Sequence, residues 1–202
     1  MKKSQTDLKE KAVIRLREPF ELMLWAGILG ISLMFLVFTM VFVLRKETGM
    51  ADFKLPRVFW LSSLVIALSS FSIDQAGQAF KKESFRSYRF YLLLTLVLGG
   101  LFVLLQFLGW SKMIQQGISF KNSFVGSFIY LISGIHILHL AGGVLCLLLI
   151  FMDSLKNLSY VDSFVYSVNP PNRLRLRLVS IYWHFVDGLW IYLFLFFLYW
   201  QT

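Results

Sequence analysis

The chain has 202 residues, of which 57% are hydrophobic and only 15% are charged. A soluble domain carries about 25% charged residues, so this chain has too few charges to cover a water-facing surface. Its net charge of +9 comes from 20 Lys and Arg against 11 Asp and Glu. These basic residues flank apolar runs and form no stripe on a soluble face, which argues against nucleic-acid binding. The composition therefore excludes a soluble protein and predicts a polytopic membrane protein.

Five apolar stretches are long enough to cross a membrane, which takes about 20 residues of α-helix. We expect an all-α protein with one membrane domain over 1–202 and a cytoplasmic tail at 1–19. The transmembrane helices are predicted at about 20–44, 58–80, 88–110, 124–151 and 178–200. Pro19 precedes the first span, where a proline in the first turn loses no hydrogen bond. The connection 152–177 contains Asn169-Pro170-Pro171-Asn172 and is predicted to be a turn-rich loop.

The distribution of basic residues predicts the orientation in the membrane. The N-terminal tail and the second and fourth connections together carry 14 Lys and Arg, whereas the opposite side carries 6. Basic residues accumulate in short cytoplasmic segments, so we expect the N-terminus in the cytoplasm and the C-terminus outside. The polar first 18 residues do not resemble a secretory signal.

Polar residues inside the spans are the candidate functional residues, because a buried Asp costs about 2.5–3.5 kcal/mol. His136 and His139 are three residues apart on the fourth span, and His184 and Asp187 are three apart on the fifth. This spacing places each pair on one helix face. At about 1.5 Å per residue the two pairs lie at similar depth. We expect a polar cluster of these four residues, with Gln106 of the third span as a lesser member.

Three interpretations of this cluster stay open: a structural and lipid-associated group, a proton pathway, and a haem or metal site. Histidines on two helices can ligate haem, but the chain has only three His. A dinuclear metal site would need several inward carboxylates, and only Asp187 lies deep in a span. We favour the structural interpretation and expect no catalytic residue and no metal. Arg86 and Arg89, at the predicted cytoplasmic edge, and Trp183 are candidate lipid contacts.

Small residues on the second, third and fourth spans predict close helix packing or hydrogen bonds between helices. Asp74, near the cytoplasmic end of the second span, is expected to reach water or Lys81 and Lys82. The small residues are Ser62, Ser63, Ser69, Ser70, Ser72, Gly99, Gly100, Gly134, Gly142 and Gly143.

The fifth span resembles the C-terminal signature of subunit III of the haem-copper oxidases. The matching residues run from Tyr182 through Trp183-His184-Phe185-Val186 to Asp187, with a closing Tyr199-Trp200. The fourth span is similar to the family's Gly-x-His-x-x-His element at residues 134–139. Leu98-Gly99 through Gln106 and Ser69-Ser70 resemble further family elements. Together they cover nearly all of 19–202 and identify the chain as similar to the five-span bacterial form.

The resemblance implies a non-catalytic subunit of a respiratory terminal oxidase of the cytochrome c type in a bacterial inner membrane. Such a subunit contains no haem or copper, which are expected in partner subunits. It packs beside catalytic subunit I in a complex with subunit II, carries phospholipid and supports proton uptake. A larger respiratory supercomplex is a further candidate partner. Many relatives have a buried Glu where this chain has Leu33, and Glu-Tyr where it has Gly109-Trp110, so roles of those carboxylates are not expected here.

Alternatives from other classes also remain. A quinol oxidase has a similar subunit III, and an independent membrane cytochrome would use paired His as haem ligands. A small transporter would show internal symmetry or helices broken at mid-membrane, and neither is evident in the sequence.

Overall fold

The computed structural model describes residues 2–45, 55–118, 124–156 and 170–201, with side chains from residue 19 onward except at 124, 125 and 170. The described residues form five α-helices, and each is long and apolar enough to cross a membrane. The helices are α1 Lys2–Arg45, α2 Val58–Lys81, α3 Phe85–Gln115, α4 Phe124–Lys156 and α6 Pro170–Trp200. The predicted all-α fold with five membrane-spanning helices is confirmed.

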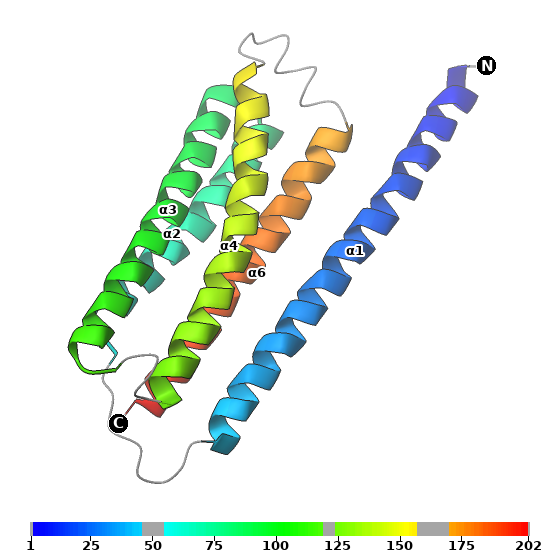
Figure 1. Ribbon diagram of the computed structural model, residues 1–202. Helices are drawn as coiled ribbons and strands as arrows, with labels where there is room; N and C mark the ends of the chain where they lie inside the picture. Colours follow the sequence, from blue (N-terminus) through cyan, green and yellow to red (C-terminus); the bar gives the residue numbers. More distant parts are fainter. Residues whose placement is uncertain (1, 46–54, 119–123, 157–169, 202) are drawn as a thin grey trace.

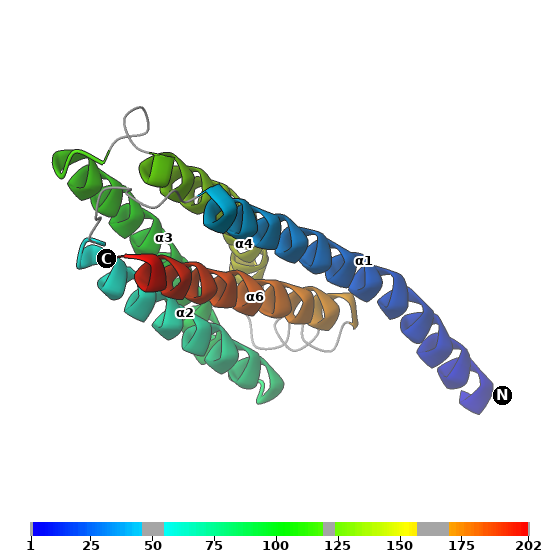
Figure 2. The ribbon, with the colours of Figure 1, turned by 90° about the horizontal axis from the view of Figure 1, so that it is seen from below.

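Four of the helices form a bundle, and the fifth lies against its outside (Figure 1). Helices α2 and α3 make an antiparallel hairpin, and α4 and α6 complete the bundle beside it. Helix α1 runs along α6 and α4 and makes no comparable contact with the hairpin (Figure 2). The start of α1 and the end of α6 lie at opposite ends of the molecule.

Two helix boundaries differ from the sequence prediction. Helix α1 continues through Pro19, although a proline was expected to precede the span; the helix tolerates the missing N–H as one lost hydrogen bond. The predicted loop over 152–177 is wrong at both ends, because α4 continues to Lys156 and α6 begins at Pro170. Proline is favoured in the first helical turn, where its missing N–H has no partner to lose. Asn169 lies outside the described residues.

The indole of Trp183 occupies the centre of the bundle, where three helices leave room for it. A Cβ atom on Gly99 of α3 would lie 3.0 Å from the Trp183 ring, and one on Gly143 of α4 would lie 3.4 Å from it. Trp183 Nε1 donates a hydrogen bond of 3.1 Å to the Ser69 hydroxyl of α2. The close approach predicted at Gly99 and Gly143 is confirmed, whereas a Cβ on Gly100 would meet no atom within 4 Å.

All five serines predicted to pack or bond between helices form hydrogen bonds from α2 to a neighbouring helix. Their partners are Gln106 for Ser62, Trp190 for Ser63, Trp183 for Ser69, His184 for Ser70 and the Tyr91 carbonyl for Ser72. Because lipid offers no competing hydrogen bonds, these contacts orient α3 and α6 around α2. The serines therefore determine which faces of α3 and α6 point inward.

Helix α1 contacts the bundle along a narrow stripe. Phe35 and Phe42 are buried against α4 and α6, and the Thr39 hydroxyl lies 2.8 Å from the Tyr192 hydroxyl. Most other large apolar residues of α1 are exposed, including Leu33 at 54%. This exposed surface is the expected surface of a helix that faces lipid or another subunit.

Candidate functional site

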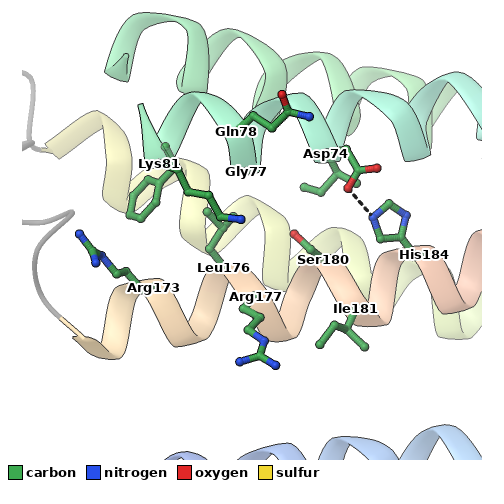
Figure 3. A pocket seen from close by; sticks show the side chains of 12 residues that line it. Asp74, Gly77, Gln78, Lys81, Arg173, Leu176, Arg177, Ser180, Ile181 and His184 are labelled. Carbon is green, nitrogen blue, oxygen red and sulfur yellow. Dashed lines mark hydrogen bonds and ion pairs between the residues drawn. The ribbon is translucent and has the colours of Figure 1, made fainter. Parts of the chain in front are cut away.

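Three polar side chains form a hydrogen-bonded series between α2 and α6. His184 Nδ1 lies 2.7 Å from the Ser70 hydroxyl oxygen, and its Nε2 lies 3.0 Å from Asp74 Oδ1 (Figure 3). Ser70 and Asp74 are four residues apart, so they share one face of α2. Both nitrogens of the imidazole therefore have a partner that can exchange a proton.

Asp74 and His184 lie at one end of a pocket of about 740 Å³ between α2 and α6. Lys81 and Arg173 line its other part, toward the ends of the two helices (Figure 3). Arg177 also lines the pocket, with its guanidinium on the side of α6 that faces α1. The remaining lining includes the apolar side chains of Ile73, Phe80, Leu176 and Ile181. The pocket is therefore cationic toward the helix ends, apolar along its walls and carries a carboxylate beside an imidazole at its inner end.

One of the pocket arginines also connects α6 to α1. Arg177 Nη1 lies 3.1 Å from Glu21 Oε1, and both side chains are partly exposed. An exposed ion pair contributes about 0–1 kcal/mol, so this contact orients the guanidinium more than it stabilises the fold.

Two polar side chains are buried with unsatisfied oxygens. Asp187 is 4% exposed, and neither carboxyl oxygen has a hydrogen-bond partner in the part of the chain that the structure describes. The Ser70 hydroxyl neighbours this carboxyl group without forming a hydrogen bond to it. Gln106 donates from Nε2 to the Ser62 hydroxyl at 3.1 Å, while its Oε1 has no partner among the described residues.

The two histidines of α4 lie among aromatic rings. His136 is fully buried, with the ring centroids of Trp190 and Phe102 at 5.6 and 6.0 Å. Neither of its nitrogens has a hydrogen-bond partner within the described ranges. His139 Nδ1 lies 2.8 Å from the Ile135 carbonyl oxygen of its own helix.

The structure therefore does not join the predicted residues into one polar cluster. His184 binds α2, and no hydrogen bond between described residues connects His136 or His139 to His184 or Asp187. Helix-face spacing and depth predict where a residue lies on its own helix, but they do not set the rotation of one helix against another. That rotation places Trp183 and Trp190 of α6 inside the bundle, where they donate hydrogen bonds to serines of α2.

The three candidate lipid contacts have different surroundings. Arg86 is exposed at the start of α3. Arg89 is partly buried, and its Nε donates to the Ser154 carbonyl of α4 at 3.0 Å. Trp183 is fully buried, so its indole is not available to a lipid at the outer surface and is not an interfacial anchor.

Sequence reasoning missed the partners of His184. Asp74 was expected to reach water or the neighbouring lysines. Its side chain is 61% exposed, and it also contacts the His184 imidazole, which was not predicted. The sequence pattern that could have predicted this contact is the spacing of Ser70, Asp74 and Lys81. They lie at intervals of four and seven residues and so share one helical face. Arg173 and Arg177 have the same four-residue spacing on α6.

The side chains of the site were also compared with the requirements of a metal ion. Among the described residues, no three His, Cys, Asp or Glu side chains gather closely enough to hold one. The α4 histidines face aromatic side chains, and His184 is already bonded on both nitrogens.

Comparison with known proteins decides the family. The family profile described as cytochrome c oxidase subunit III matches residues 46–202. The chain belongs to this family. It is 30% identical over 179 residues to a probable cytochrome c oxidase subunit 3 of Mycobacterium leprae, which covers 86% of this chain and 79% of the relative. A probable cytochrome c oxidase subunit 3 of Nocardia farcinica is 28% identical over 180 residues, with the same two coverages.

A third relative is named for ubiquinol as the electron donor, where the first two are named for cytochrome c. The cytochrome bo(3) ubiquinol oxidase subunit 3 of Buchnera aphidicola is 28% identical over 179 residues, covering 86% of this chain and 89% of the relative. The predicted membership of the subunit III family is confirmed. Subunit III is a non-catalytic, multi-pass membrane subunit of an oxygen-reducing complex and associates with other subunits of that oxidase.

Proposed function

We propose that this subunit III supports a cytochrome c oxidase in a bacterial inner membrane by holding a phospholipid in the pocket between α2 and α6. The pocket carries this proposal, because it combines three cationic side chains with apolar walls. Arg and Lys bind phosphate oxygens by charge-assisted hydrogen bonds, and a basic pocket between membrane helices suits a lipid headgroup. An acyl chain would follow the apolar lining toward Ile73 and Ile181.

The proposed leaflet follows from the proposed orientation. The pocket cations lie at the end of the molecule where α1 begins (Figure 1). The 14 basic residues assigned to that end, against 6 at the other, favour the cytoplasmic side. We infer that 1–202 forms one membrane domain and that the lipid belongs to the cytoplasmic leaflet.

The lipid proposal is tested by counting phospholipids in the purified oxidase. The oxidase is isolated with wild-type subunit or with Lys81→Gln, Arg173→Gln and Arg177→Gln combined, and extracted lipids are quantified by mass spectrometry. The expected result is loss of about one phospholipid per complex. Arg57→Gln, at an exposed arginine beyond the other end of α2, is the matched control and should retain the full count. An unchanged count in the triple variant would contradict the proposal.

The proposed partners are catalytic subunit I and subunit II, and a larger respiratory supercomplex is a further candidate. A mild purification through a tag on the N-terminus should recover large partner subunits that carry the haem absorbance. The isolated chain should be colourless in a reduced-minus-oxidised spectrum. Haem bound to the chain alone would show instead that its histidines are ligands and would overturn this assignment.

The Buchnera relative supports a second candidate, a subunit III of a quinol oxidase. Under the first candidate, a cytochrome c oxidase, the recovered complex should oxidise reduced cytochrome c. Oxidation of ubiquinol without cytochrome c oxidation would favour the second candidate. Neither result tests the lipid proposal, which depends on the phospholipid count alone.

A further inference from the structure

Arg177 belongs to two neighbouring surfaces of α6. It lines the pocket between α2 and α6, but its guanidinium lies on the side of α6 that faces α1 (Figure 3). There its Nη1 is 3.1 Å from Glu21 Oε1 of α1. Lys81, by contrast, extends from α2 toward α6 across the pocket (Figure 3). Arg177 is therefore a pocket residue whose charge is directed toward a carboxylate outside the pocket.

The ion pair lies at the end of the stripe that holds α1 against the bundle. Ile28, Phe35 and Phe42 are the buried apolar residues of this stripe, and they follow Glu21 at intervals of seven residues. A spacing of seven keeps residues on one seam between packed helices, so Glu21 faces the bundle as they do. Helix α1 diverges from the bundle toward its N-terminus (Figures 1 and 2). The stripe therefore ends in a charged contact where α1 begins to leave the bundle.

A phosphate group and the Glu21 carboxylate would bind the same part of Arg177. A guanidinium forms charge-assisted hydrogen bonds to both kinds of oxyanion. The Glu21–Arg177 pair is partly exposed, and exposed ion pairs contribute little free energy, so phosphate oxygens can compete for it. Arg177 already lines the pocket, so rotation of its side chain would direct the guanidinium inward without movement of α6.

We propose that Arg177 is shared, so that a phospholipid in the pocket and Glu21 of α1 compete for its guanidinium. The lipid then weakens the contact that holds the Glu21 end of α1, and release of this end strengthens lipid binding. Linkage requires the two effects to be equal in size. This inference rests on the proposed lipid and adds to it a conformational consequence for α1.

The first test measures phospholipid binding to the full chain in dodecyl maltoside micelles. Dioleoylphosphatidylglycerol is titrated into the micelles, and the lipid retained per chain after gel filtration is counted by mass spectrometry. Glu21→Gln removes the competing carboxylate and should lower the lipid fraction at half-saturation by about two- to fivefold, as expected for an exposed ion pair. Adding Glu21→Gln to Arg177→Gln should change nothing further, because Glu21 acts through Arg177.

Asp153→Asn is the matched control for the loss of a carboxylate. Asp153 of α4 lies 4.0 Å from Arg175 of α6 across another exposed ion pair, and Arg175 is not among the described residues that line the pocket. The half-saturation of this variant should equal that of the wild type. An equal gain in Asp153→Asn and Glu21→Gln would show a general effect of charge and would overturn the sharing of Arg177.

The second test follows the position of α1 by pulsed electron paramagnetic resonance. Spin labels are placed at the exposed positions Met23 of α1 and Phe90 of α3, after the native cysteine is removed by Cys146→Ser. Adding dioleoylphosphatidylglycerol should broaden the distance distribution of the wild-type chain. Glu21→Gln should give the broad distribution without the lipid.

The outcomes separate this inference from the lipid proposal. Lipid binding that is weakened by the combined Lys81→Gln, Arg173→Gln and Arg177→Gln substitutions but unchanged by Glu21→Gln would overturn the sharing of Arg177 and leave the lipid proposal standing. A distance distribution that does not respond to bound lipid would also overturn it. Binding that is equal in the wild type and the triple variant would contradict the lipid proposal, and this inference with it.

Discussion

Gly109→Ala should destabilise the bundle because α3 meets a phenylalanine of α2 at that position. A Cβ atom on Gly109 would lie 2.8 Å from Phe59 Cζ, whereas carbon atoms in contact prefer about 3.5–4.0 Å. The ring would have to retreat by about 0.7 Å to reach the lower limit. Phe59 is 2% exposed and its ring centroid is 6.0 Å from that of Trp190. The cavity beside these rings has a volume of about 10 Å³, which is too small to accept the ring.

The magnitude follows from a comparison with Gly100→Ala on the same helix. A Cβ there would meet no atom within 4 Å, so that variant gains helix propensity without a clash. Alanine is favoured over glycine in a helix by about 1 kcal/mol, and this gain cancels between the two variants. Overpacking a well-filled core costs about 1–3 kcal/mol. We therefore expect Gly109→Ala to have an unfolding free energy about 1–3 kcal/mol below that of Gly100→Ala.

The assay is unfolding of the full chain in mixed micelles by titration with a denaturing detergent, followed by tryptophan fluorescence. Phe59→Leu in the Gly109→Ala background provides a further check, because it removes the clashing ring atoms. The double variant should lose less stability than the sum of the two single losses. Equal stability of Gly109→Ala and Gly100→Ala would refute the reasoning, because it would show that Phe59 adjusts without cost.

Ser69, Phe42 and Asp187 are the subjects of three further predictions. Ser69→Ala leaves the buried Trp183 indole without its acceptor and should cost about 0.6–1.7 kcal/mol of unfolding free energy, the range of hydrogen bonds between membrane helices; an unchanged value would mean that the indole finds another acceptor. Phe42→Ala removes a fully buried ring between α1 and the bundle and should lower the yield of a disulfide cross-link engineered between α1 and α6, whereas Leu44→Ala, at a 73% exposed position, should not. Asp187→Leu should reduce the yield or working life of the oxidase, while the haem spectrum of the assembled complex stays unchanged; a lost haem band would contradict the absence of a cofactor role.

The exposed face of α1 shows that hydropathy does not predict which side of a membrane helix packs against other helices. Apolar residues point both toward lipid and toward neighbouring helices, so hydropathy finds a span without showing which side packs. Phe35 and Leu33 are both apolar and two residues apart, yet one is 1% and the other 54% exposed. The contact that separates them is made by His136 and His139 of α4, which lie far along the chain.

The sequence by itself determined the five helices, because each apolar stretch has the length that a bilayer requires. It also identified small residues where close packing is possible, but it did not separate Gly99, which lies against Trp183, from Gly100, where a Cβ would meet no atom within 4 Å. Only the tertiary structure decided which polar residues meet. The rotation of α6 directs His184 to Ser70 and Asp74 and separates it from His136. That rotation results from Trp183 packing between Gly99 and Gly143 and binding Ser69, a contact among four helices that no spacing within a single helix contains.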